Sequence, residues 1–191
     1  MSELNKKVII LTAPSGAGKT SITQFLLANY PQLAFSVSAT TRAPRGAEQD
    51  GVDYHFISPA AFEGHINQND FLEYEMVYEG LYYGTLKSEL DRIWAQGKTP
   101  VLDIDVKGAI AIQEQLGNQA LSIFILPPSI EALKERLASR NTESEEKIQM
   151  RLDKAAYELS LSDQFNAVVK NEVLDTACKE TAAFIQGFIS K

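Results

Sequence analysis

The sequence predicts an α/β fold in which helices flank a largely parallel sheet. Short apolar runs rich in β-branched residues alternate with longer segments whose apolar residues recur at helical spacing, and this alternation is typical of parallel sheets. A glycine-rich turn joins the first apolar run to the first helical segment. No repeat, low-complexity stretch or linker interrupts the chain, so we expect one domain spanning residues 1–191.

The predicted strands are short runs made mostly of apolar residues, and the first of them, residues 8–11, is continuously apolar, as expected for a strand buried on both faces. They comprise residues 8–11, 101–105, 122–126 and 167–169. Helices are expected after the glycine-rich turn, at the N-cap and proline pair Ser58-Pro59, at Ser129, after the capping-box sequence 142–145, and from about Asp175.

Composition and charge exclude several classes of protein. The net charge is −7, which argues against a nucleic-acid partner held by a general basic field. The apolar run near the start is too short for a signal peptide or a membrane span, and no other stretch is long enough. The single cysteine, Cys178, cannot form an internal disulfide. We therefore expect a cytoplasmic protein with no membrane partner.

Residues 13–20 form a phosphate-binding loop in the right context, after a strand and before a helix. Ala13 replaces the usual first glycine, but Gly16 and Gly18 allow backbone N–H groups to curl around phosphate oxygens. Lys19 is placed to reach the β- and γ-phosphates, and Thr20 to offer a hydroxyl to Mg²⁺. The motif predicts a site for a nucleoside triphosphate.

Two aspartates end the second predicted strand. Ligands of parallel α/β sheets bind at the carboxyl ends of strands, so Asp103 is a candidate Mg²⁺ residue beside Thr20, acting through water, and Asp105 points toward the same cleft. The alternative is that either aspartate caps the turn into Gly108 and its helix. His55 and His65 lack metal-ligand spacing and are expected to be surface or structural residues.

Two segments differ in character from the core. Residues 37–91 are rich in Gly, Tyr, Thr and charge, and we interpret them as an inserted substrate-binding subdomain. Residues 136–159 are strongly charged and are expected to form a helical lid. The core then comprises residues 1–36, 92–135 and 160–191.

Several blocks, in order along nearly the whole chain, resemble guanylate kinases. They are residues 35–45 with Glu48, Gly51 and 54–56, then 71–73, 82–85, 102–105 with Gly108, and 125–129. The resemblance implies a P-loop fold with an inserted GMP-binding subdomain. It also implies transfer of the γ-phosphoryl group from ATP to GMP, giving ADP and GDP, in purine nucleotide metabolism and GMP recycling.

The resemblance assigns roles on the GMP side. Arg42 and Arg45 hold the GMP phosphate, because each guanidinium can bind a phosphate bidentately, and the hydroxyls of Tyr54 and Tyr83 add donors. Glu73 matches the guanine reader, whose carboxylate accepts from N1–H and the N2 amine together, while adenine offers neither donor there. The full GMP-binding set is Ser38, Arg42, Arg45, Tyr54, Glu73, Tyr83, Thr85 and Asp105.

The resemblance also assigns the ATP side and the lid. The implied ATP-binding residues are Ala13, Pro14, Ser15, Gly16, Ala17, Gly18, Lys19, Thr20, Ser21 and Asn171. The implied catalytic residues are Lys19, Arg136, Arg140 and Arg151. Asn141 follows Arg140 where the family usually has glycine, and asparagine tolerates the left-handed backbone that such a turn needs. Ion pairing with Glu135, Glu143 and Glu146 is the alternative for the lid arginines.

These assignments imply Mg²⁺ as the cofactor and ATP and GMP as substrates, with dGMP as a second acceptor left open. Six of the 18 basic residues fall in the predicted sites, so cations are concentrated locally in an acidic protein. Two alternatives remain: a kinase for another monophosphate or a sugar phosphate on the same fold, and a non-catalytic interaction module like the guanylate-kinase-like domains of scaffold proteins. Intact Lys19 and Thr20 disfavour the second.

Overall fold

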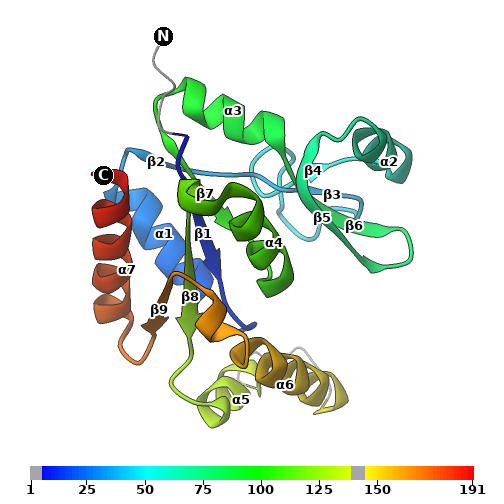
Figure 1. The fold of residues 1–191 in the computed structure, drawn as a ribbon. Helices are drawn as coiled ribbons and strands as arrows, with labels where there is room; N and C mark the ends of the chain where they lie inside the picture. Colours follow the sequence, from blue (N-terminus) through cyan, green and yellow to red (C-terminus); the bar gives the residue numbers. More distant parts are fainter. Residues whose placement is uncertain (1–5, 139–144) are drawn as a thin grey trace. The chain divides into compact units, whose positions relative to one another are not determined.

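The computed structural model describes residues 6–138 and 145–191, except the side chains of Tyr78, Arg136, Leu137, Ala138 and Lys147. The chain divides into two compact units, which we describe separately (Figure 1). The first unit comprises Met1–Pro31 and Asp103–Lys191, and the second comprises Gln32–Leu102.

The first unit contains three parallel strands in the order β1-β8-β9. They are β1 (Val8–Thr12), β8 (Ala120–Leu126) and β9 (Ala167–Lys170). Every residue of β1 is buried, and so is every residue of β8 up to Ile125. The apolar runs of β1 and β8 therefore form buried parallel strands, as predicted, whereas β9 is buried only at alternate residues.

Helices cover both faces of these strands. The pair α1 and α7 packs together on one face, while α4 packs against β1 and β8 from the other (Figure 1). The helices of the unit are α1 (Lys19–Asn29), α4 (Val106–Leu116), α5 (Ile130–Ala138), α6 (Glu145–Leu159) and α7 (Leu174–Ile189), with short 3-10 turns η1 (Gly117–Gln119) and η2 (Ser162–Gln164).

The two ends of the first unit are joined by a buried lysine. Lys7 precedes β1, and its Nζ donates to the carbonyls of Phe188 at 2.9 Å and Ile189 at 3.1 Å. These carbonyls lie in the last turn of α7, where unpaired carbonyls carry partial negative charge. The cation therefore satisfies the end of the helix and ties it to the strand that leads to the phosphate-binding loop.

The second unit contains a two-stranded parallel pair and a separate four-stranded sheet. The pair is β2 (Leu33–Phe35) with β7 (Thr99–Asp103). The sheet has the order β4-β3-β6-β5, with β5 and β6 antiparallel. Its strands are β3 (Ala39–Thr40), β4 (His55–Phe56), β5 (Phe71–Tyr78) and β6 (Leu81–Leu86), and the helices of the unit are α2 (Pro59–Asn67) and α3 (Lys87–Ala95).

An aromatic cluster holds α2 on the four-stranded sheet. Phe62 is fully buried, and its ring stacks on Phe71 with centroids 4.3 Å apart and on Tyr82 at 5.0 Å. As predicted, Ser58 caps this helix, because its hydroxyl accepts from the N–H of Ala61 at 3.1 Å. The sheet and α2 thus form a small core of their own within the second unit.

Other helix starts also agree with the sequence. The hydroxyl of Ser129 accepts from the N–H of Ala132 at 3.1 Å, one residue before α5 begins. The helix after the predicted capping box is α6, although residues 142–144 lie outside the described residues. Cys178 is buried in α7. Across the part of the chain described, none of the helices combines the length and the apolar character needed to cross a membrane.

Candidate active site

The phosphate-binding loop connects the buried strand β1 to α1. Gly16 and Gly18 both have left-handed backbone angles, with φ of 91° and 97°. Gly18 occupies the N-cap position of α1, which begins at Lys19 and has no side-chain cap. The first N–H groups of the helix are therefore left for a ligand, and the helix dipole favours an anion there.

Asn171, which follows β9, holds the backbone of the loop through a hydrogen bond. Its side-chain amide donates to the carbonyl of Ala17 at 2.8 Å, and its side chain is buried. A Cβ built on Gly18 would lie 2.2 Å from the Asn171 Nδ2 atom. Only glycine fits at position 18, since both the left-handed backbone and this close contact exclude a side chain. The sequence predicted Asn171 at the ATP site, and the described contacts of its side chain are with the loop itself.

Lys19 is held by groups on the chain that follows the second unit. Its ammonium forms an ion pair with Asp103 and donates to the carbonyl of Ile104 at 3.0 Å. Both Lys19 and Asp103 are partly exposed, at 18% and 23% of their side-chain surface. The two residues that the sequence assigned to the triphosphate and its metal therefore lie in direct contact.

The oxygen donors at the loop suit Mg²⁺. Thr20 is exposed in the first turn of α1, and the Asp103 carboxylate lies beside its neighbour Lys19. Mg²⁺ prefers oxygen ligands and usually binds one or two protein groups together with water and phosphate oxygens. No group of three or more His, Cys, Asp or Glu side chains suited to a metal occurs among residues 6–138 and 145–191. The donor set thus fits a metal that arrives with a nucleotide.

One arginine of the segment predicted to form a lid contacts the loop. The Arg151 Nη1 atom, on α6, donates to the hydroxyl of Ser15 at 2.9 Å. Helix α6 is fixed to α5 by a small apolar core, made of Leu133, Leu152 and Ala155 with Ile148 packed against them. Arg140 lies outside the described residues, and Arg136 is in α5 with a side chain that is not described.

Two carboxylates near the loop have clear structural surroundings. The Oδ1 atom of Asp105 accepts from the N–H of Gly108 at 2.8 Å and caps α4, the alternative that the sequence had left open. Glu158 on α6 was not singled out by the sequence, yet it is 7% exposed. Burial raises the pKa of Glu158, partly offset by Lys154 at 3.6 Å, while Asp105 raises it further and Lys19 lowers it.

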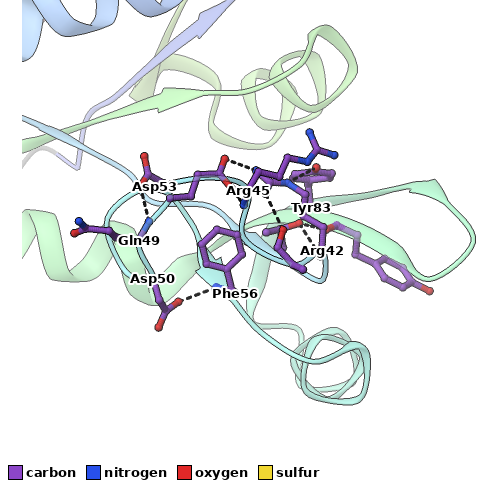
Figure 2. A network of polar contacts seen from close by, with 11 residues as sticks. Arg42, Arg45, Gln49, Asp50, Asp53, Phe56 and Tyr83 are labelled. Carbon is purple, nitrogen blue, oxygen red and sulfur yellow. Dashed lines mark hydrogen bonds and ion pairs between the residues drawn. The ribbon is translucent and has the colours of Figure 1, made fainter. Parts of the chain in front are cut away.

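The second unit gathers the predicted GMP-phosphate residues around Arg42, and Figure 2 shows Arg42 with Arg45 and Tyr83. The Arg42 Nε atom donates to the hydroxyl of Tyr83 at 3.1 Å. Its guanidinium lies 4.8 Å from the ring centroid of Tyr54 and 5.5 Å from that of Phe56. Such stacking fixes the plane of the guanidinium and stabilises its charge. The structure therefore brings Arg42, Tyr54 and Tyr83 together, while the side chain of Arg45 is exposed nearby.

Glu48 completes this cluster, although the sequence gave it no role. Its carboxylate accepts from Arg42 Nη1 at 2.5 Å and Nη2 at 2.7 Å, and from the N–H of Arg45 at 2.7 Å. These bonds hold the pKa of Glu48 at about 2, and they raise the pKa of Arg42 above its usual value. Glu48 thereby closes the loop that carries both arginines.

The loop between β3 and β4 is further fixed by two aspartates (Figure 2). Asp53 accepts from the N–H of Gln49, and Asp50 accepts from the N–H of Phe56, each at 2.8 Å. The short side chains replace hydrogen bonds that a regular strand would supply. Phe56 is thereby placed against Arg42. The sequence offered no signal for this role beyond the presence of turn-forming residues.

Glu73 and Thr85 face each other across β5 and β6. They are register partners, and the Thr85 hydroxyl donates to the Glu73 Oε1 atom at 2.8 Å. Thr85 is fully buried and Glu73 is half-buried, so this bond fixes one carboxylate oxygen. Ser38 precedes β3, and its carbonyl accepts from the N–H of His55 at 2.9 Å. Apart from Asp105, the predicted GMP-binding residues all lie in the second unit.

Comparisons with known proteins identify the family of this chain. The family model described as guanylate kinase matches residues 5–187. A guanylate kinase of Bacteroides thetaiotaomicron is 45% identical over 191 residues, covering 100% of this chain and 94% of the relative. One of Salinibacter ruber is 48% identical over 186 residues, covering 97% and 98%. The crystal structure of guanylate kinase from Anaplasma phagocytophilum superimposes with a TM-score of 0.73 at 27% identity, covering 95% of this chain and 85% of that one, and has the same α/β fold. Sequence and fold together place the chain in the guanylate kinase family.

Proposed function

We propose that the protein transfers the γ-phosphoryl group of ATP to the phosphate of GMP, giving ADP and GDP. The observation that carries this proposal is the pairing of Glu73 with Thr85 on the sheet that also bears the Arg42 cluster. An oriented carboxylate can accept the hydrogen bonds that guanine donates. An arginine with two tyrosine hydroxyls can donate to the oxygens of a phosphate. Family membership supports the same reaction.

On the donor side, the loop from Ala13 to Thr20, with Ser21, holds the triphosphate. Backbone N–H groups around Gly16 and Gly18 bind phosphate oxygens, and Lys19 neutralises charge on the β- and γ-phosphates. The Lys19–Asp103 ion pair supports this assignment, because it holds the ammonium next to the proposed Mg²⁺ residue. Asn171 contributes by fixing the loop backbone through Ala17.

On the acceptor side, Glu73 distinguishes guanine from adenine. Its carboxylate accepts from guanine N1–H and the N2 amine, whereas adenine would leave a partly desolvated carboxylate without donors. Ser38, Thr85 and Asp105 are assigned to the remaining edges of the base. Arg42 and Arg45 bind the phosphate, and the hydroxyls of Tyr54 and Tyr83 add neutral donors.

The transfer itself needs no general base, because the GMP phosphate is already ionised at neutral pH. Catalysis consists of in-line positioning and neutralisation of charge by Lys19, Arg136, Arg140 and Arg151. The hydrogen bond from Arg151 to Ser15 supports a role for α6 at the triphosphate. Thr20 and Asp103 would hold Mg²⁺, Asp103 through water, and the ion would neutralise phosphate charge.

The acceptor is tested by measuring ADP release with GMP, dGMP, AMP, dTMP and CMP. We expect GMP to have a kcat/KM about 10⁴-fold above that of AMP, because a site built to hydrogen-bond a polar group rejects an analogue lacking it. Glu73→Gln should lower this ratio by about 10²-fold or more, with the ATP KM unchanged. A parent enzyme that uses AMP within tenfold of GMP would refute the guanine assignment.

Calorimetry with ATP separates an enzyme from an interaction module on the same fold. We expect ATP to bind the parent protein and Lys19→Met to bind it weakly. A parent protein that binds no ATP with Mg²⁺ present would exclude the proposed reaction.

A further inference from the structure

Glu89 is a buried carboxylate outside all the predicted site residues. It lies in the first turn of α3, and only 4% of its surface is exposed. A charged group in such a place is costly unless it is paired and hydrogen-bonded. Its partners therefore indicate what the residue does.

Three segments of the second unit meet at this carboxylate. The N–H of Val37 donates to its Oε1 atom at 3.1 Å. Arg92 of the same helix donates through Nε at 2.9 Å and Nη2 at 2.7 Å. His55 on β4 has its Nε2 atom 3.8 Å from Oε2. Burial opposes the ionised form, but the bonds from Arg92 and Val37 outweigh it and lower the pKa of Glu89.

The bond to Val37 replaces a missing strand contact. Val37 lies in the connection between β2, which ends at Phe35, and β3, which begins at Ala39. The backbone here is outside the regular ladder of both strands, and Val37 is buried. A buried backbone N–H needs a partner, and the Glu89 carboxylate supplies it. The position of the connection thus depends on a side chain of α3.

The segments held by Glu89 are those that carry proposed GMP-binding residues. Val37 precedes Ser38, whose carbonyl accepts from the N–H of His55, and His55 follows Tyr54. Helix α3 begins directly after β6, the strand of Tyr83 and Thr85. One carboxylate therefore links the backbone next to Ser38, the strand next to Tyr54 and the helix next to Thr85.

We propose that Glu89 is a positioning residue of the GMP site. It acts through the Val37 N–H and through α3, which together set the places of Ser38 and of the segments that bind the phosphate. This inference rests on the proposed GMP-binding residues. A residue that only stabilised the fold would lower the yield of active enzyme without changing its affinity for GMP, whereas a positioning residue changes that affinity.

The test compares Glu89→Ala, Glu89→Asp and Glu89→Gln with the parent enzyme. We expect Glu89→Ala to raise the KM for GMP about tenfold, because the buried N–H loses its acceptor, with the KM for ATP and kcat within twofold. Glu89→Asp keeps the charge but shortens the side chain by one methylene, and should raise the GMP KM severalfold. Glu89→Gln keeps an acceptor for Val37, while the half-exposed Arg92 turns to solvent, and should stay within threefold of the parent.

Glu63→Ala, at an exposed position on α2, controls for loss of a carboxylate in the same unit. It should leave both KM values unchanged. Circular dichroism confirms that each variant is folded, and Glu89→Asp decides the question if Glu89→Ala does not fold. The inference is overturned by an unchanged GMP KM in folded Glu89→Asp, or by equal increases in the two KM values.

The Arg45→Ala variant distinguishes a failure of the Glu89 inference from a failure of the proposed GMP-binding site on which it rests. Arg45 is a proposed phosphate ligand, so its loss should raise the GMP KM whatever Glu89 does. If Arg45→Ala raises the GMP KM and the Glu89 variants do not, the positioning role fails alone. If Arg45→Ala has no effect, the proposed GMP site itself is wrong, and the inference falls with it.

Discussion

At the scale of single residues, the position of the Lys19 ammonium depends on two groups at the start of the segment 103–191. Asp103 and the carbonyl of Ile104 hold its ammonium at the phosphate-binding loop. We expect Lys19→Met to lower kcat about 10²–10³-fold, because one preorganised charge on the transferred group is lost. Steady-state kinetics with both nucleotides saturating measures the effect.

Lys107→Met is the matched control for this change, since Lys107 is exposed on α4 of the same unit. It should keep kcat within twofold, and both variants should have the unfolding temperature of the parent within a few degrees. A Lys19→Met enzyme with near-parent kcat would contradict the proposed role.

Glu48 gives a prediction about pH. Folding lowers its pKa from 4.5 to about 2, so its bonds to Arg42 and Arg45 stabilise the fold fully above about pH 4.5 and are lost as the pH falls toward 2. We expect Glu48→Gln to be less stable than the parent by a constant amount from pH 5 to 8. The difference should shrink below pH 4.5, as measured by urea unfolding.

Glu63→Gln controls for the removal of one negative charge from an exposed position on the same unit. A stability difference for Glu48→Gln that stays constant down to pH 3 would show that the ionised carboxylate is not what stabilises the loop.

At the scale of elements, the close pairing of β5 and β6 depends on Gly84. A Cβ at this position would lie 2.9 Å from the Glu73 carbonyl, the Phe71 ring and the Tyr74 Cβ atom. We expect Gly84→Ala to destabilise the protein by about 1–3 kcal/mol, because the strands must move apart. The displacement shifts Glu73 relative to Thr85, so the KM for GMP should rise with the KM for ATP unchanged.

Gly64→Ala is the control, because a Cβ on Gly64 of α2 meets nothing within 4 Å. It should stabilise the protein by about 0.5–1 kcal/mol, as alanine is the better helix former. Unfolding in urea measures both changes. Equal stability of the two variants would show that the strands tolerate a side chain at position 84.

The buried parallel strands were predictable, whereas the four-stranded sheet was not. The runs 8–11 and 123–126 are continuously apolar, so their pattern alone indicates buried strands. By contrast, β3 and β4 have two residues each and are too short to show any periodicity. Their pairing depends on side chains such as Asp50, which replaces a backbone partner.

The contrast between local sequence patterns and tertiary contacts also explains which site residues could be identified from the sequence. Lys19 belongs to a motif whose spacing is fixed by local chain geometry, so it could be identified without a structure. Glu48, Glu89 and Glu158 acquire their roles from partners or burial that only the fold creates. Without tertiary contacts each of them is an ordinary surface carboxylate in the sequence.

At the scale of the whole molecule, an acidic chain has to bind two anionic substrates. The net charge is −7, so the general field repels nucleotides, and the proposed binding relies on cations at the loop and around Arg42. Lys19 and Arg151 belong to the first unit, and Arg42 and Arg45 to the second. If the proposed roles of these residues are right, each unit carries the cations for one nucleotide.

This division predicts that removing a cation from one unit reduces stabilisation by one nucleotide and not by the other. A ligand at one hundred times its Kd adds about 2.7 kcal/mol of stability, or about 5–10 °C in unfolding temperature for a chain of this size. We expect ATP and GMP each to raise the unfolding temperature of the parent. Lys19→Met should abolish the ATP shift and keep the GMP shift, whereas Arg45→Ala should do the reverse. Each substitution removes a cation from one unit only. If either variant lost both shifts while its unfolding temperature without nucleotide matched that of the parent, the cations of the two units would not serve separate nucleotides.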